Sequence, residues 1–260
     1  MRKVEIAIIG GSFTKLDFPE LNKEIRIGTP YGLATSISIM EIGERIVAFL
    51  PRHGVHHTLP PHKINYRANL YALYRLGVER IIALHAVGAI NRQLRKGDLV
   101  VPKDFLDLTR NRESTFYDES PVVHIDLSEP YCPEIRQVLN ETLEERGFQP
   151  LLDAVIACME GPRFETPAEI KMLQSLGADI VGMTSATEAV LARELEMCYA
   201  SLCFVSNMAA GIEKRVSVSE IQEVAGSTIP VIETVLRKAL EKIPLNRRCV
   251  CAHALEESKV

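Results

Sequence analysis

Short apolar runs alternate along this chain with segments in which apolar residues recur every three or four positions. The apolar runs predict buried strands at 4–11, 81–90, 97–108, 151–162, 178–183 and 199–207. The helical spacing is found at 62–77, 132–147, 166–177, 186–198 and 217–243. Residues 35–51 alternate around Gly43 and predict a β-hairpin. Strands and helices alternate without a repeat or a linker, which predicts a single α/β domain over residues 1–243 and a short tail over 244–260.

Composition and charge exclude several classes of protein. Of the 260 residues, 47% are hydrophobic and 25% are charged, the usual mixture of a globular protein. A net charge of −4 argues against a nucleic-acid-binding protein, which normally carries a basic excess. No apolar run approaches the roughly 18 residues that cross a bilayer, and the first residues lack a signal-peptide pattern. We therefore expect a cytoplasmic protein without nucleic-acid or membrane partners.

The six cysteines match no zinc-binding spacing along the chain. Cys158, Cys198 and Cys203 lie in apolar runs, where cysteine behaves as a small buried hydrophobe, and Cys132 is also isolated. The pair Cys249-Val-Cys251 follows two arginines near the C-terminus. It is either a redox pair with lowered thiol pKa values or two unrelated surface cysteines.

The stretch 160–188 brings polar side chains to the ends of predicted strands. Phe164 and Glu165 precede a helix start formed by Thr166, Pro167 and Glu169, and Thr184 follows a short buried strand. Loops at strand ends are where α/β sheets place ligand chemistry. An ordinary helix–strand unit with a polar loop is the alternative interpretation.

Other strand ends carry groups that suit an oxyanion. Ser12 follows Gly10 and Gly11, and the predicted hairpin ends at Arg52 and His53, where a planar guanidinium can grip phosphate. His56 and His57 follow, but no carboxylate lies at ligand spacing, so we expect no metal. The glycine pair lacks the third glycine of a dinucleotide-binding motif.

A heterocycle can be recognised beside this oxyanion. Phe164 offers a stacking face, while Glu165 and Asn207 offer planar hydrogen-bonding edges. Phosphate beside a heterocycle, without a dinucleotide motif, suggests a nucleoside that meets inorganic phosphate. His85 lies on an apolar strand, where a core histidine is the default interpretation. The long polar loop that runs to His124 indicates function or a subunit contact.

These segments resemble the trimeric purine nucleoside phosphorylase and methylthioadenosine phosphorylase family. The matching segments, in family order, are IIGGS, RHG, KINYRANLYAL, GDLV, TFYD, EPYCP, EGPRFET, ADIVGMTSATEAVLARE and the strand ending in SN. The resemblance implies a central mixed, partly barrel-like sheet flanked by helices. It also implies phosphorolysis of a purine nucleoside to free base and a ribose-1-phosphate-type sugar in purine salvage, without a metal or organic cofactor.

The resemblance also implies roles for individual residues. Those that would hold phosphate are Ser12, Arg52, His53, Thr184 and, through its backbone N–H, Ala86. Those that would contact the nucleoside are Phe164, Glu165, Met183, Asn207, Met208 and Ala209. We expect Arg52, His53 and Asn207 to carry the catalysis. His85 replaces a threonine or asparagine beside the phosphate and is either a new phosphate ligand or a core residue.

Substrate choice is where the chain departs from the methylthioadenosine branch. That branch carries two aspartates where this chain has Asn207 and Ala209, and small hydroxyl residues where it has Glu165. A 6-oxopurine offers an N1–H donor to Glu165 and an O6 acceptor to Asn207, whereas adenine would leave mismatched buried groups. We expect inosine- or guanosine-like substrates, with methylthioadenosine as the alternative.

Three further points stay open. Val218 and Ile221 lie where the methylthio branch has apolar residues, so methylthioinosine is also a candidate substrate. The family pattern implies a homotrimer or a hexamer in which His124 reaches a neighbour's 5′ pocket, and a disulfide between Cys249 and Cys251. Phe13-Thr14 and His85 depart from the family pattern, which would suit a catalytically silent nucleoside-binding protein.

Overall fold

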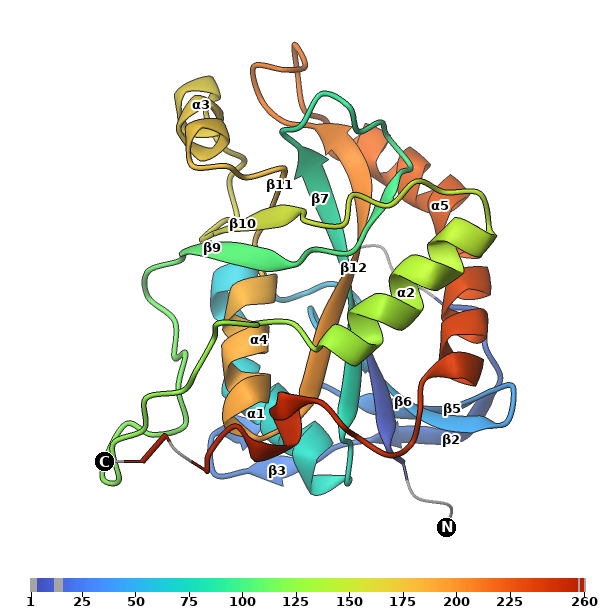
Figure 1. Ribbon diagram of the computed structural model, residues 1–260, viewed down its shortest axis with the longest axis vertical. Helices are drawn as coiled ribbons and strands as arrows, with labels where there is room; N and C mark the ends of the chain where they lie inside the picture. Colours follow the sequence, from blue (N-terminus) through green and yellow to red (C-terminus); the bar gives the residue numbers. More distant parts are fainter. Residues whose placement is uncertain (1–3, 12–15, 257, 260) are drawn as a thin grey trace.

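The computed structural model describes residues 4–11, 16–256 and 258–259. A mixed sheet lies between helices in one α/β unit (Figure 1). Its strands are β1 (Ile6–Gly10), β2 (Glu20–Ile25), β5 (Ile37–Ile42), β6 (Arg45–Pro51), β7 (Arg80–Ala89), β8 (Leu99–Val100), β9 (Asp104–Leu108), β10 (Val155–Met159), β11 (Ile180–Gly182) and β12 (Cys198–Met208). A separate two-stranded sheet pairs β3 (Gly28–Thr29) with β4 (Gly32–Leu33).

The described residues also form five α-helices and two short 3₁₀ helices, of which α5 and η2 follow the last strand. The helices are α1 (Tyr66–Arg75), α2 (Pro133–Glu145), α3 (Pro167–Ser175), α4 (Ser185–Glu194), α5 (Val218–Lys242), η1 (Pro61–Lys63) and η2 (Val250–His253). Thr166 caps α3 by accepting from the backbone N–H of Glu169, whose carboxylate accepts from the Thr166 N–H in return. The capping box predicted from the sequence is thus confirmed. No helix in the described ranges is both long and apolar enough to cross a membrane.

The two long strands β7 and β12 form the centre of the sheet. They are parallel, and their pairing begins with Arg80 opposite Cys198 and ends with Ala89 opposite Met208. The strand order across the sheet through β7 is β2-β5-β6-β1-β7-β11-β10-β9. Strands β1 and β6 continue the parallel arrangement, whereas β11 pairs antiparallel with the end of β7. Figure 1 shows β9 and β10 crossing the direction of β7, so the sheet bends strongly around its centre. The mixed sheet with flanking helices is the predicted fold class.

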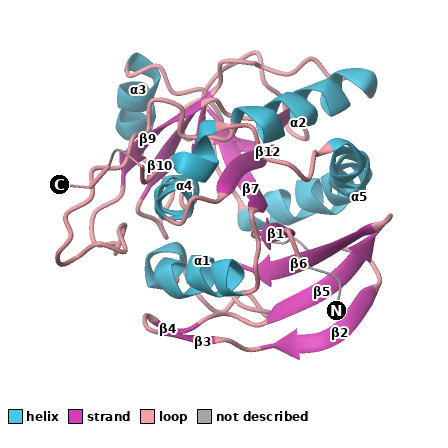
Figure 2. Ribbon diagram, turned by 60° about the horizontal axis from the view of Figure 1, so that its bottom comes forward, coloured by secondary structure: helices cyan, strands magenta, loops and turns pink. Residues whose placement is uncertain are grey.

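Helices cover both faces of the sheet. Ile6 and Ile8 of β1 belong to an apolar cluster with α2 and α5, whereas Ala7 and Ile9 belong to a cluster with α1 and α4. Figure 2 shows α1 beside α4 and α2 beside α5. Because successive side chains of a strand point to opposite faces, a strand buried on both faces reads as a continuous apolar run. This explains why the central strands were predictable.

Some sequence-based expectations need correction. The predicted strand 97–108 is two strands, β8 and β9, because Pro102 lies between them and lacks the N–H for a continuous ladder. Strands β2, β3 and β4 carry no clear alternation and have no counterpart in the prediction. The hairpin at 35–51 is confirmed as β5 and β6, and α5 runs through Gly226 and Pro230 as one helix.

The cysteines differ most from expectation. All six are buried free thiols, so the structure contains no disulfide between Cys249 and Cys251, and these two are not surface residues. Cys132 and Cys198 are not isolated, because they lie beside Cys249 with Sγ–Sγ distances of 3.7 and 3.4 Å. The fold thus gathers cysteines that are far apart along the chain.

Candidate active site

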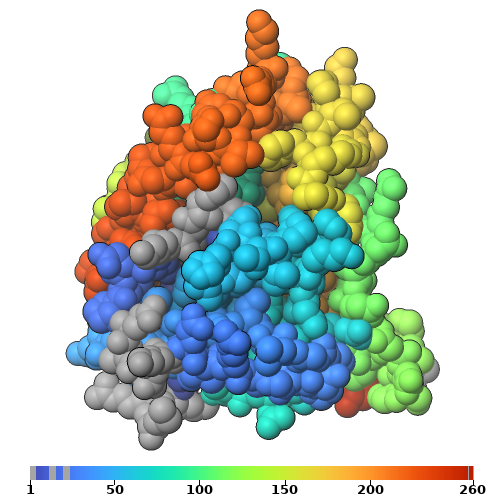
Figure 3. All heavy atoms as spheres, turned by 180° about the vertical axis from the view of Figure 1, so that it is seen from behind, coloured from blue at the N-terminus to red at the C-terminus, as the bar shows by residue number. Residues whose placement is uncertain are grey.

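The predicted site residues surround one cavity of about 550 Å³ at the C-terminal ends of the central strands. Those that line it are Arg52, His53, His85, Ala86, Phe164, Glu165, Met183, Thr184, Asn207, Ala209 and Val218. They come from the C-terminal parts of β6, β7, β11 and β12 or directly after them, from the segment before α3 and from the start of α5. Figure 3 shows the face on which the contributing segments meet, with residues 53–61 in cyan, 162–165 in yellow and 216–222 in orange.

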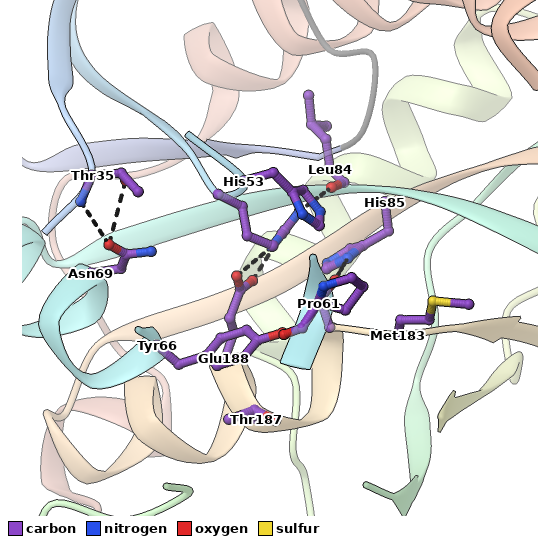
Figure 4. A network of polar contacts seen from close by, with 12 residues as sticks. Thr35, His53, Pro61, Tyr66, Asn69, Leu84, His85, Met183, Thr187 and Glu188 are labelled. Atoms are coloured by element: carbon purple, nitrogen blue, oxygen red, sulfur yellow. Dashed lines mark hydrogen bonds and ion pairs between the residues drawn. The ribbon is translucent and has the colours of Figure 1, made fainter. Parts of the chain in front are cut away.

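Arg52 is held rigidly at one end of this cavity. Its Nη2 donates to Glu188 Oε2 at 2.9 Å, its Nε donates to the other carboxylate oxygen, and its Nη1 donates to the Leu84 carbonyl at 3.0 Å (Figure 4). Both side chains are almost fully buried. Burial opposes the charge of Arg52, but the Glu188 carboxylate outweighs it and raises the arginine pKa. Three of five guanidinium hydrogens are committed, so two are left for a ligand.

Gly11 allows Arg52 to reach this position. A Cβ atom at Gly11 would lie 2.5 Å from the Leu84 carbonyl oxygen and 3.1 Å from Arg52 Nη1. The first contact involves backbone and cannot be relieved by a rotamer change. The glycine after the first strand therefore serves the close approach of two backbone segments and a guanidinium.

Thr184 and His85 form the adjoining wall. Thr184 precedes α4, and its side chain makes no capping bond to that helix. Its Oγ1 lies 3.0 Å from His85 Nδ1, and His85 Nε2 lies 3.2 Å from the Tyr199 hydroxyl. The N-terminus of α4 favours a negative charge beside Thr184. Burial lowers the pKa of His85 well below its usual value, so His85 is neutral in the free protein.

His53 is also neutral. Its Nδ1 lies 2.8 Å from the Leu59 carbonyl, which can only accept, so Nδ1 carries the proton and Nε2 is an acceptor. Burial and the charge of Arg52 lower the pKa of His53 to about 3. The ring of His57 lies beside it with centroids 4.3 Å apart.

A β-bulge directs two consecutive residues of β12 into the cavity. The pairing of β12 with β7 shifts register between Val205 and Asn207, and both Ser206 and Asn207 line the cavity. A regular strand would turn one of them away. Ser206 Oγ donates to Asn207 Oδ1 at 2.9 Å, and Asn207 Nδ2 donates to the Met208 carbonyl at 2.9 Å. One Nδ2 hydrogen and one Oδ1 lone pair are left for a ligand.

Glu165 and Phe164 enter from the segment before α3. Burial raises the pKa of Glu165, whereas Phe164 is 39% exposed at the cavity edge. Val218, at the start of α5, is 53% exposed and lies on the lining beside Ile221, which is buried. The cavity thus has a cationic end that suits an anion, a planar polar end and an apolar edge.

Two predicted residues do not line this cavity, and a third cannot be placed relative to it. Ser12 lies outside the described residues. Met208 is absent from the lining and packs with the apolar cluster of α1 and α4. His124 is exposed in the long loop, where its backbone N–H donates to the Ser258 carbonyl at 2.8 Å, and it does not line the cavity of its own chain.

Three functional positions were missed by the sequence reasoning. Glu188 orients Arg52 and lies one helical turn after Thr184. Ser206 orients Asn207 and directly precedes it in the chain. Arg112, from the long loop, donates to the Met183 carbonyl at 2.7 Å and to the Glu160 carbonyl at 2.8 Å. It therefore fixes the segments that carry Met183 and Phe164. The unusual length of its loop was the only signal.

The chain is similar to known proteins over nearly all of its length. A family model described as Phosphorylase superfamily matches residues 5–241. A Pyrococcus furiosus protein named 6-oxopurine nucleoside phosphorylase is 48% identical over 260 residues, covering 96% of this chain and 97% of the relative. A Methanopyrus kandleri protein named Probable S-methyl-5'-thioinosine phosphorylase is 46% identical over 258 residues, covering 98% and 99%.

A solved structure has the same fold. The methylthioadenosine phosphorylase from Schistosoma mansoni in complex with adenine superposes with a TM-score of 0.90 at 30% identity, covering 98% of this chain and 96% of that one.

Proposed function

The chain belongs to the phosphorylase superfamily, and on this premise we propose that it cleaves 6-oxopurine nucleosides with inorganic phosphate. The products are the free purine base and ribose 1-phosphate. The observation that carries the proposal is that Glu165 and Asn207 line the same cavity as Arg52 and Thr184. This shared lining supports base recognition and anion binding within reach of one nucleoside. The relatives named for 6-oxopurine nucleosides and for methylthioinosine support the choice of base.

Phosphate binds at the Arg52 end of the cavity. The two uncommitted guanidinium hydrogens, the Thr184 hydroxyl and backbone N–H groups such as that of Ala86 supply its hydrogen bonds. Glu188 neutralises part of the arginine charge, so these neutral donors and the start of α4 carry a large share of the binding. We assign no metal or organic cofactor to the reaction; phosphate is a co-substrate.

The base binds between Glu165 and Asn207. An ionised Glu165 accepts from the N1–H of a 6-oxopurine, and the free Nδ2 hydrogen of Asn207 is donated to O6 and N7, which are both acceptors. Adenine has an N1 lone pair and a 6-amino group, so both contacts would be mismatched. A buried mismatch of this kind costs about 1–3 kcal/mol per group.

The reaction follows from charge development in this geometry. The bond from C1′ to N9 breaks with its electron pair going to the purine, and a phosphate oxygen forms the new bond to C1′. The ribosyl group passes through an oxocarbenium-like state that the adjacent phosphate stabilises, and Asn207 stabilises the electron-rich purine at N7. Fixing phosphate below C1′ also removes an entropic cost of bringing the reactants together.

The apolar edge of the cavity supports a second substrate, which differs at the 5′ position. Val218 is exposed at the cavity edge beside Ile221, and an apolar edge suits a 5′-methylthio group. We therefore include 5′-methylthioinosine with inosine and guanosine. We further propose a homotrimer, or a pair of trimers, in which His124 of a neighbouring copy completes this edge.

The experiment is product formation from inosine, methylthioinosine and methylthioadenosine, each with and without phosphate. Phosphate-dependent cleavage of the two 6-oxopurine nucleosides, with little cleavage of methylthioadenosine, is expected. Preferred cleavage of methylthioadenosine would contradict the base assignment. Tight binding of inosine without phosphate-dependent turnover would contradict the catalytic assignment and favour a binding protein.

A further inference from the structure

Four cysteines from three distant segments meet at the opposite end of β12 from the cavity. Cys132 precedes α2, Cys198 begins β12, and Cys249 and Cys251 flank the start of η2 in the tail. All four sulfur atoms lie within 4.8 Å of one another, and all four residues are buried. We call these four residues the cysteine cluster.

The spacing of the sulfur atoms is that of a metal site. Cys249 Sγ lies 3.4 Å from Cys198 Sγ and 3.7 Å from Cys132 Sγ. A tetrahedral zinc ion with Zn–S bonds of about 2.3 Å separates its sulfur ligands by about 3.8 Å. All four cysteines are free thiols. The cluster therefore has the ligand type, number and spacing of a closed Cys₄ site.

A buried arginine supplies complementary charge. Arg80 is 2% exposed, and its Nη1 lies 3.8 Å from Cys198 Sγ in donating geometry. Its Nη2 donates to Glu134 Oε2 at 2.9 Å, and its Nε has no hydrogen-bond partner. Four thiolates around Zn²⁺ carry two net negative charges, which a neighbouring guanidinium stabilises. Four neutral thiols carry no charge that could balance that of the guanidinium. Hydrogen bonds to ligating sulfur are the usual outer support of such sites.

The tail is held in place independently of the sulfur atoms. The Arg248 backbone N–H donates to Glu134 Oε1 at 2.8 Å, and the Leu255 N–H donates to Glu196 Oε1 at 3.3 Å. Both acceptors lie two residues from a cysteine of the cluster. The convergence of the four thiols is therefore a consequence of the tail's docking and not of sulfur contacts alone.

We propose that Cys132, Cys198, Cys249 and Cys251 bind one structural zinc ion. On binding, each thiol releases its proton to solvent as its sulfur forms a bond to Zn²⁺, and no oxidation state changes. With four protein ligands the site has no open position for substrate, so its role is to fasten the tail to the starts of α2 and β12. Asn207 lies about 30 Å further along β12, so the zinc takes no part in phosphorolysis.

The first test is the zinc and thiol content of the full-length protein, produced with zinc in the medium and purified without chelator. One zinc per chain by mass spectrometry, and all six thiols titratable after denaturation with chelator, are expected. Zinc-free protein that has fewer than six thiols would overturn the proposal in favour of disulfides. Six thiols with no zinc taken up after incubation with zinc would overturn it as well.

Matched alanine variants test the assignment of ligands. Cys251→Ala should lose most of the bound zinc and lower Tm, whereas Cys203→Ala, a fully buried cysteine of β12 outside the cluster, should keep the zinc. Zinc retained in Cys251→Ala, or lost equally in both, would contradict the assignment.

If Cys251→Ala does not fold, cobalt titration of the metal-free parent decides: the visible absorption of tetrahedral cobalt thiolate is expected, and its absence would overturn the proposal. Below the unfolding temperature, turnover of inosine should not depend on bound zinc, so this test and that of the proposed function fail independently.

Discussion

The Nδ1 atom of His85 lies 3.0 Å from the hydroxyl oxygen of Thr184, at the end of the cavity where Arg52 lies. The Tyr199 hydroxyl donates to the Glu188 carboxylate at 2.8 Å, so it can only accept from His85 Nε2–H. Neutral His85 has a single N–H, and its Nδ1 is therefore the acceptor for the Thr184 hydroxyl. In the proposed function Thr184 turns its proton from His85 to an incoming phosphate, and we infer that this couples phosphate binding to the orientation of His85.

Thr184→Val should raise KM for phosphate by about tenfold or more, because a neutral hydrogen bond to a charged ligand contributes about 1.5–3 kcal/mol. The measurement is initial rate against phosphate at saturating inosine. Thr187→Val is the control, because Thr187 lies in the first turn of the helix that follows Thr184 and is buried but does not line the cavity. An unchanged phosphate KM in Thr184→Val, or an equal rise in both variants, would show that Thr184 does not contact phosphate.

Glu165→Gln should flatten the acid side of the pH profile with inosine. Burial raises the pKa of Glu165, and only its ionised form accepts from N1–H. The activity of the parent should therefore fall as the pH drops through this raised pKa, whereas glutamine accepts through its amide oxygen at any pH. Values of kcat/KM for inosine, measured between pH 5 and 8 for the parent and for Glu165→Gln, provide the test.

The control for this profile is Glu169→Gln. The bonds from Arg163 and from the Thr166 N–H lower the pKa of Glu169 to about 2, and its carboxylate does not line the cavity. Glutamine at this position also preserves the capping box. If Glu165→Gln keeps the acid limb of the parent, some other group controls it.

Asn207→Asp should reduce kcat/KM for inosine by about 100-fold, because one lost preorganised contact costs about 3 kcal/mol in the barrier. The carboxylate removes the free Nδ2 donor and places negative charge beside O6 and N7. Activity on adenosine or methylthioadenosine should fall much less, since Asp can accept from the 6-amino group. Comparable losses on both classes of base would argue against a role in base selection.

Asn69→Asp is the matched control for this change. Asn69 is 2% exposed and accepts from the Thr35 backbone N–H at 3.0 Å, but it does not line the cavity. A buried charge at this position should lower stability without changing the ratio of inosine to adenosine activity. The Asn69→Asp variant therefore separates the effect of burying a carboxylate from the effect of altering base recognition.

How far the sequence predicted this site depends on how local each signal is. Arg52, Thr184 and Asn207 each lie within two residues of the end of an apolar strand, so the rule that ligands bind at strand ends was enough to group them. Their partners were not predictable in the same way. Glu188 pairs with Arg52 across 136 positions of sequence, and a carboxylate on a helix is in most cases simply solvated.

The cysteines show the same limit more sharply. Zinc sites are recognised in a sequence when their ligands lie in pairs that are separated by a few residues. Of these four cysteines only Cys249 and Cys251 form such a pair. Cys132 and Cys198 join them because α2 begins, and β12 begins, at the same end of the central sheet. Only tertiary structure carries that information.

Acid pH should destabilise the protein through His53. Its pKa is about 3 in the folded protein, because burial and the charge of Arg52 disfavour the imidazolium, against about 6.5 in the unfolded chain. Between these values the unfolded chain binds more protons, so stability is complete above pH 6.5 and is lost as the pH falls towards 3. The loss is about 1.4 kcal/mol per pH unit for each such group, and His85, whose pKa is lowered in the same direction, adds to it.

The free energy of unfolding of His53→Gln, measured between pH 5 and 8, isolates this contribution. Its dependence on pH below 6.5 should be shallower than that of the parent by about 1.4 kcal/mol per unit, while the His85 contribution persists. His56→Gln is the control, because His56 is exposed on the same loop. Identical slopes in the parent and in His53→Gln would mean that the pKa of His53 is the same in the folded and the unfolded chain. In that case His53 would become positively charged below about pH 6.5, and the dominance of neutral donors at this end of the cavity would not hold at acid pH.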